Sequence, residues 1–121
     1  MAKGIGCDII EISRIKKSIA RHGQHFYDKV YSKREQTYCL KHADPAPHFA
    51  VRFAAKEAIV KALGTGLRKG IGWQDIEIIN NSDGKPEVHF SNAVNELFSY
   101  PQVLISLSHC REYAMATALL L

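Results

Sequence analysis

The residues best suited to chemistry in this 121-residue sequence lie in one alanine-rich stretch, residues 52–66. Charged side chains occur there twice, as Arg52 with Lys56 and as Glu57 with Lys61. At about 100° per residue, the two pairs lie on two rims of a helix. A charge in so apolar a segment is costly unless it is paired or binds a ligand, so the segment is a candidate site. The alternative is that Glu57 and Lys61 form an ordinary i,i+4 surface pair.

A second candidate, Asp8, lies in a short apolar run at residues 3–10 that predicts a strand. Strand alternation puts Gly4, Gly6 and Asp8 on one face, so two glycines leave open space beside a carboxylate. One partner for such a carboxylate is a metal ion that it shares with a second carboxylate. The other interpretation is that Asp8 caps the helix that follows, and the sequence leaves both open.

Polar groups also occur at the end of a strand predicted over residues 103–109, at Ser108 and His109. Adjacent strand residues point to opposite faces and no orienting acid is evident, so a Ser/His nucleophile pair is disfavoured. His109 is better suited to contact a phosphate, or is an ordinary histidine in a turn. Gly64 and Gly66 form a tight turn whose amides could bind an anion. Because that turn follows a helix C-terminus, whose dipole disfavours anions, a helix cap is the stronger interpretation.

The elements that must position these residues follow from hydrophobic periodicity and capping signals. Helices are predicted over 11–21, 32–40, 47–63 and 91–98, and strands over 3–10, 73–80, 87–90, 103–109 and 112–121. Ser32 and Glu35 form a capping box for the second helix. Helices and hairpins are segregated more than alternated, so we expect an α+β fold with a mainly antiparallel sheet packed on the long alanine-rich helix. One broad side of that helix is small and apolar, at Val51, Ala54, Ala55, Ala58, Ile59 and Ala62.

Length, charge and cysteine usage narrow the classes of function. The length suits a single domain, 1–121, and the net charge of +4 favours an anionic partner. The aromatic residues do not interleave with a basic stripe, so nucleic-acid binding is disfavoured. Three scattered cysteines predict free thiols in a reducing cytoplasm. No apolar run approaches the roughly 18 to 20 residues of a membrane span, so no membrane partner is expected.

Taken together, three blocks in this order resemble the small phosphopantetheinyl transferases of the holo-acyl-carrier-protein synthase type. The blocks are GIGCDI at 4–9, RFAAKEAIVKALGTG at 52–66, and SLSH at 106–109 followed by Tyr113 and Ala114. Residues 73–78 and 83–86 also look like segments of that family, so the likeness spans nearly the whole chain. Cys110 departs from the family, which more often has a polar residue there, and we expect it to be packed in the ordinary way.

The resemblance implies that the 4′-phosphopantetheine arm of coenzyme A moves to a serine of an acyl carrier protein, in fatty acid biosynthesis. Adenosine 3′,5′-bisphosphate is the by-product. It also implies Mg²⁺ held by Asp8 and Glu57, with Lys61 reaching the same phosphates. The base for the serine hydroxyl is Glu57 or a water held by the carboxylates. The family forms homotrimers that bind coenzyme A between neighbouring subunits.

The resemblance further assigns residues to the two substrates. The nucleotide half of coenzyme A would lie against Arg52, Gly64, Gly66, Ser108 and His109. Acyl carrier proteins are acidic, and Arg14, Lys17 and Arg21 recur at spacings of three and four, so they would share a face that steers the carrier. The rival hypothesis is a non-catalytic module that binds coenzyme A or a nucleotide, for which Asp8 and Glu57 would matter little.

Overall fold

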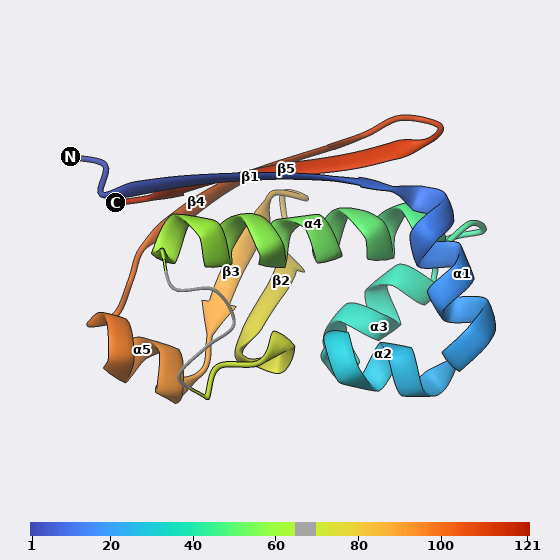
Figure 1. The fold of residues 1–121 in the computed structure, drawn as a ribbon, viewed down its shortest axis with the longest axis horizontal. Helices are drawn as coiled ribbons and strands as arrows, with labels where there is room; N and C mark the ends of the chain where they lie inside the picture. Colours follow the sequence, from blue (N-terminus) through green and yellow to red (C-terminus); the bar gives the residue numbers. More distant parts are fainter. Residues whose placement is uncertain (65–69) are drawn as a thin grey trace.

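The structure is a computed structural model, and it describes residues 1–64 and 70–121 (Figure 1). Its elements, in chain order, are β1 (Gly4–Glu11), α1 (Ile12–His22), α2 (Gln24–Val30), α3 (Lys33–Leu40), α4 (Ala46–Leu63), a 3₁₀ turn (Trp73–Asp75), β2 (Ile76–Asn80), β3 (Pro86–Phe90), α5 (Asn92–Phe98), β4 (Val103–His109) and β5 (Tyr113–Leu120). The predicted α+β class is confirmed, and all strand pairing in the described residues is antiparallel.

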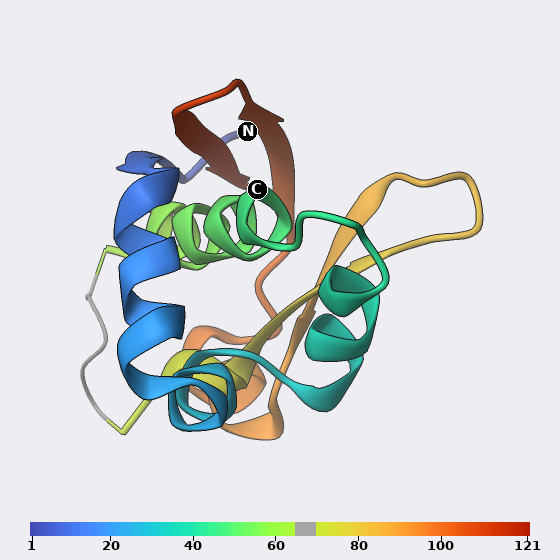
Figure 2. The same ribbon diagram turned by 90° about the vertical axis from the view of Figure 1, so that its right-hand side faces the viewer.

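The strands form two sheets rather than the single sheet that the sequence suggested. One sheet has the order β1-β5-β4, and β2 and β3 form a separate hairpin. The three-stranded sheet covers the long helix α4, which Figure 2 shows almost end-on. In that view α1 lies on one side of α4, and α3 and the β2–β3 hairpin lie on the other. The two sides of α4 therefore face different surroundings.

The backbone of the sheet packs close to the backbone of α4, because very small residues face each other across this contact. Alanines of α4 and β5 share one buried cluster, at Ala54, Ala55, Ala58, Ala62, Ala116 and Ala118. On β1, a Cβ at Gly6 would lie 1.9 Å from the carbonyl oxygen of Ala58, and one at Gly4 would lie 2.2 Å from that of Ala62. Only glycine fits at these two positions. The open space that the sequence analysis expects beside Asp8 is therefore wrong at Gly4 and Gly6, because the backbone of α4 fills it.

The helix ends follow the capping signals. Ser32 accepts a hydrogen bond from the Glu35 amide while the Glu35 carboxylate accepts one from the Ser32 amide, which confirms the capping box. Gly64 ends α4 in the left-handed region at φ 86°, where glycine is favoured. The prediction that α4 ends in a glycine cap is therefore confirmed.

One helix has no counterpart among the predicted elements, and one predicted strand begins too early. Residues 24–30 form α2, whose Val30 is buried in the core. The strand predicted over 73–80 begins only at Ile76. The Gly72 amide donates a hydrogen bond to the Asp75 carboxylate at 2.7 Å and holds residues 73–75 in a 3₁₀ turn.

Lys56, which the sequence places on one rim of α4, has a fully buried side chain. Its Nζ donates to Glu35 Oε1 at 2.8 Å and to the carbonyls of Val30 and Trp73 at 2.6 Å and 3.1 Å. The second oxygen of Glu35 accepts the Ile78 amide of β2 at 2.8 Å. This ion pair joins α3, α4 and β2 inside the protein. Burial lowers the pKa of Lys56, and the Glu35 charge opposes that shift.

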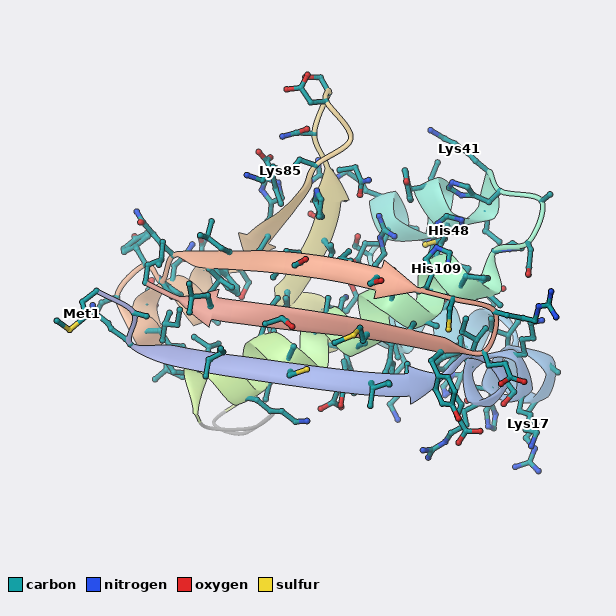
Figure 3. The ribbon with its side chains drawn as sticks, turned by 90° about the horizontal axis from the view of Figure 1, so that it is seen from above. Met1, Lys17, Lys41, His48, Lys85 and His109 are labelled. Atoms are coloured by element: carbon teal, nitrogen blue, oxygen red, sulfur yellow. The ribbon has the colours of Figure 1, made fainter. Side chains whose placement is uncertain are left out.

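The outer face of the three-stranded sheet carries large apolar side chains. Figure 3 looks onto this face. Its exposed apolar residues include Ile5, Ile9, Leu104, Tyr113 and Met115, with Ile5 69% and Ile9 63% exposed. An apolar face of this extent is typical of a surface that another chain covers. Separately, no helix in the described part of the chain is long and apolar enough to cross a membrane.

Candidate active site

Asp8, Lys61 and Glu57 meet on one side of α4, beneath β1. Asp8 shares the inward side of β1 with Gly4 and Gly6, which keeps the strand against the helix. The Lys61 ammonium donates to Asp8 Oδ1 at 3.2 Å and to the Cys7 carbonyl at 2.9 Å. Asp8 and Lys61 are 53 positions apart in the sequence, yet their side chains are neighbours in space.

The Glu57 carboxyl lies close enough to feel the charge of Asp8. Burial raises the pKa of Glu57, the Asp8 charge raises it further, and the Lys61 ammonium lowers it. Two carboxylates that repel each other, of which only Asp8 is paired with Lys61, make a site that favours an added cation. Oxygen donors of this kind suit Mg²⁺, which takes its remaining ligands from water and phosphate. In the part of the chain that the structure describes, no group of three or more His, Cys, Asp or Glu side chains gathers to hold a metal by itself.

The two simpler interpretations of these residues do not describe the structure. Asp8 does not cap α1, because the N-cap position is Glu11 and no side chain caps that helix. Lys61 pairs with Asp8 across the strand–helix contact, and no ion pair joins it to Glu57 in the described residues. The acidic pair and its lysine are therefore arranged between two elements rather than along one helix.

These residues line an open hollow of about 460 Å³ between β1, α1 and α4. Arg14 of α1 lines the same hollow, and Ile15, Phe26 and Phe53 give it an apolar wall. Arg14, Lys17 and Arg21 are all exposed, and Figure 3 shows Lys17 extending outward from α1. The basic face predicted for α1 thus borders the acidic pair.

Arg52 and His109 lie on the opposite flank of α4. Glu57 follows Arg52 by five positions on the helix, a rotation of about 140°. Arg52 faces the β2–β3 hairpin, where Nη2 donates to Asn80 Oδ1 at 2.8 Å. His109 ends β4, the sheet edge opposite to β1, and lies near His48 in Figure 3. One chain therefore does not bring all the predicted site residues together: it presents two separate groups.

Three further predicted positions are less informative. Ser108 precedes His109 on β4, so strand alternation directs it to the opposite face of the sheet. The Gly64 amide donates to the Val60 and Lys61 carbonyls, in keeping with its role as a cap, and Gly66 lies outside the described residues. Cys110 is exposed in the β4–β5 turn, where backbone amides lower its pKa, so the expectation of ordinary packing is wrong.

Sequence reasoning missed two histidines beside His109. The His48 ring stacks on the His42 ring with centroids 3.5 Å apart, and the His109 ring lies edge-on to His48 at 5.9 Å. The i,i+4 spacing of His48 and Arg52 on one helix was a usable signal. His42 lies after the end of α3, and nothing in the sequence pattern indicates that the chain folds back there.

Comparison with known proteins fits this arrangement. The profile of the 4′-phosphopantetheinyl transferase superfamily matches residues 4–118, and the chain belongs to that family. Within it, the chain is 55% identical over 118 residues to the holo-[acyl-carrier-protein] synthase of Protochlamydia amoebophila, covering 98% of this chain and 97% of that protein. It is 53% identical over 117 residues to the synthase of Chlamydia caviae, covering 97% and 95%.

Solved structures of the same kind share the fold. The holo-[acyl-carrier-protein] synthase of Neisseria meningitidis superimposes with a TM-score of 0.91 at 31% identity, covering 100% of this chain and 99% of that one. The Helicobacter pylori synthase, solved in complex with coenzyme A, gives a TM-score of 0.88 at 31% identity, covering 97% and 99%.

Proposed function

We propose that this protein transfers the 4′-phosphopantetheine group of coenzyme A to a serine of an acyl carrier protein. The products are the holo-carrier and adenosine 3′,5′-bisphosphate, and the reaction belongs to fatty acid biosynthesis. The observation that carries the proposal is the meeting of Asp8, Glu57 and Lys61 in one hollow beside the basic face of α1. Full-length similarity to holo-[acyl-carrier-protein] synthases supports it.

In the proposed reaction the serine hydroxyl of the carrier attacks the phosphorus that bears the pantetheine arm. The new bond is Ser O–P, the bond to the nucleotide phosphate breaks, and the bisphosphate leaves with the electron pair. Lys61 would support this step, because its ammonium lies in the same hollow as Asp8 and Glu57, where it would meet a bound phosphate. Such transfers depend mainly on positioning and on electrostatic stabilisation.

The hydroxyl proton needs an acceptor. The raised pKa of Glu57 makes its carboxylate a better base than an ordinary glutamate, and a water held by Asp8 and Glu57 is the other candidate. Asp8 and Glu57 are also the residues that would hold Mg²⁺, since they supply paired oxygen donors with an excess of negative charge. When bound, the ion would neutralise charge on the diphosphate.

The separation of the two groups of residues supports a homotrimer with coenzyme A bound between subunits. The diphosphate would lie at Asp8, Glu57 and Lys61 of one copy. The nucleotide would lie at Arg52 and His109, with Ser108 at the same strand end and with Gly64 and Gly66 as the remaining contacts. The exposed apolar face of the sheet gives such an assembly a surface to bury. A single domain, 1–121, working in the cytoplasm completes the proposal.

The carrier protein would dock on α1. Arg14, Lys17 and Arg21 are exposed, and Arg14 lines the hollow that holds the acidic pair. Complementary charge raises the encounter rate and orients an acidic partner, so the carrier serine would be directed towards Glu57. The non-catalytic alternative, a module that only binds coenzyme A, gives no role to these basic residues.

Mass spectrometry of an acidic acyl carrier protein tests the function directly. After incubation with this protein, coenzyme A and Mg²⁺, the carrier gains the mass of phosphopantetheine, and a chelator abolishes the gain. Glu57→Gln removes turnover while the fold is kept. Transfer by Glu57→Gln at the wild-type rate would show that the assignment of the acidic pair is wrong.

A mixing experiment tests the site between subunits. Glu57→Gln damages one group of residues and His109→Glu damages the other. If each site takes one group from each of two neighbours, random mixed trimers recover roughly a quarter of wild-type activity. Activity equal to the sum of the two separate variants would mean that each site lies within one chain.

A further inference from the structure

Lys61 pairs with the Asp8 carboxylate in the free protein. Its ammonium donates to Asp8 Oδ1 at 3.2 Å and to the carbonyl of Cys7 at 2.9 Å. Both acceptors belong to β1, which lies at one edge of the three-stranded sheet. An ammonium group has three N–H donors, so two of the three are directed at this strand. The cation that Asp8 holds in this structure is therefore one that the chain itself supplies.

The contact between α4 and β1 fixes where this ammonium lies. The backbone of Gly6 rests on the backbone of α4, since a Cβ there would lie 1.9 Å from the carbonyl oxygen of Ala58. Asp8 follows Gly6 by two positions on the strand, and Lys61 follows Ala58 by less than one turn of the helix. Backbone packing therefore brings Lys61 and Asp8 together.

Lys61 is the member of this ion pair that can leave. Its side chain is 53% exposed, whereas that of Asp8 is 20% exposed. A lysine has a flexible four-carbon stem, and an ion pair in contact with solvent shifts an equilibrium by about fivefold or less. An incoming anion can therefore draw the ammonium away from Asp8, while the carboxylate stays in place on its short stem.

The hollow beside β1 offers the ammonium a second position. Asp8, Glu57 and Lys61 all line it, and its volume of about 460 Å³ leaves room for a diphosphate beside them. With Lys61 on Asp8, two carboxylates and one ammonium leave a single net negative charge. With Lys61 on an anion, Asp8 and Glu57 can both offer oxygens to a divalent cation. The two positions of Lys61 therefore give the acidic pair two different affinities for that cation.

We propose that Lys61 is a resident counter-ion of Asp8, which holds the place of the divalent cation until a diphosphate draws the ammonium away. The inference rests on the proposed function, because the diphosphate is that of coenzyme A and the cation is the one that Asp8 and Glu57 would hold. In the free protein the ammonium neutralises Asp8 and repels a second cation. Once Lys61 has turned to the diphosphate, Asp8 becomes available. The cation and coenzyme A therefore enter the site together rather than independently.

Linkage makes this exchange measurable. The cation and coenzyme A tighten each other's binding by one common factor. Part of that factor comes from direct contact between phosphate oxygens and the cation, which needs no lysine. The remainder comes from the departure of Lys61 from Asp8. A lysine that lay nearby without moving would weaken cation binding equally with and without coenzyme A, so its removal would leave the common factor unchanged.

Binding of Mn²⁺, followed by electron paramagnetic resonance of the unbound ion, tests the exchange without turnover. Wild type and Lys61→Met are titrated with Mn²⁺ alone and at saturating coenzyme A, with no carrier protein present. A blank with coenzyme A alone corrects for the cation that the unbound ligand holds. Without coenzyme A, Lys61→Met should bind Mn²⁺ about three- to tenfold more tightly than wild type, because the ion pair and the repulsion are both removed. The factor by which coenzyme A tightens Mn²⁺ binding should fall by a similar amount.

The matched control is Lys29→Met, which removes the same charge from an exposed position on α2 and should behave as wild type in both titrations. Thermal unfolding of each variant checks that the fold is kept. Mn²⁺ binding by free Lys61→Met that is no tighter than in wild type would overturn the proposal. Equal tightening with and without coenzyme A would also overturn it, because Lys61 would then be only a nearby charge.

Two outcomes separate this inference from the proposed function. If wild type modifies the carrier and Lys61→Met gives either contrary result with Mn²⁺, the resident counter-ion is wrong and the enzyme assignment stands. If wild type binds no Mn²⁺ even with coenzyme A present and does not modify the carrier, both fail together.

Discussion

Replacing Gly6 with alanine adds one methyl group to β1, and it should disturb the active site more than a methyl group added anywhere else in that strand. The new Cβ would lie 1.9 Å from the Ala58 carbonyl oxygen and 2.8 Å from the Ala62 amide nitrogen. Real Cβ contacts essentially never fall below 3.0 Å, so β1 and α4 must separate by about 1.1 Å at this point. The obstructing atoms belong to helix backbone and cannot move aside as a flexible side chain would.

This separation has two measurable effects. Overpacking of a well-packed core typically costs about 1–3 kcal/mol, and the backbone contact puts Gly6→Ala at the upper end. A melting temperature lower by roughly 10 °C is therefore expected. Asp8 lies two residues further along β1, so its distance from Glu57 and Lys61 changes as well. A displacement of about 1 Å at catalytic groups costs about 10²-fold in rate.

The assay is the initial rate of carrier modification well below the melting temperature, together with thermal unfolding of the same samples. Gly72→Ala is the control, because the nearest atom to its Cβ would be Asp75 Oδ2 at 3.9 Å. Gly4→Ala, also blocked at 2.2 Å but further from Asp8, should destabilise the fold with a smaller loss of rate. Wild-type stability and rate in Gly6→Ala would refute the view that β1 rests on the backbone of α4.

Three other variants probe separate features. In metal-free protein, Glu57→Gln should unfold at a higher temperature than wild type at pH 7.5, because a carboxyl whose folded pKa is raised opposes folding when charged. That gain should shrink as the pH falls through the folded pKa, and thermal melts across pH would show it; an equal gain at all pH values would contradict it. Lys56→Met leaves the Glu35 carboxylate buried and unpaired, so it should cost about 3–5 kcal/mol in chemical denaturation, whereas a loss under 1 kcal/mol would mean that water reaches the site. Arg14→Glu should raise the KM for the carrier steeply and leave coenzyme A affinity nearly unchanged; equal losses in both would argue against docking on α1.

The sequence predicts most of the elements because their signals are local. The alanine stripe and Gly64 define α4, and the Ser32–Glu35 box defines the start of α3. By contrast, α2 has seven residues and no side-chain cap, so packing of Val30 and its neighbours into the core stabilises it rather than its own sequence. Division of the strands into two sheets depends likewise on tertiary packing.

The site was predictable to the same extent. Asp8 and Glu57 stood out because carboxylates are rare in such apolar surroundings, and the structure brings them together with Lys61. Lys56 was an equally clear candidate from its apolar surroundings, yet it forms a buried ion pair with Glu35. The sequence predicted Glu35 only as part of a capping box. The stacking of His42 on His48 depends on a loop that returns the His42 ring to α4, and no periodic pattern encodes such a contact.

The alanines between α4 and β5 have a consequence for how this protein changes over time. An alanine has a single methyl group and no rotamers, so the buried cluster that includes Ala58 and Ala116 has no alanine side chain that could rearrange to absorb an added carbon. Enlarging a residue on one surface requires a smaller one opposite, and glycine is the only smaller residue. Substitutions here must therefore arise as compensating pairs, and we expect this buried layer to diverge far more slowly among descendants than the apolar residues around α1.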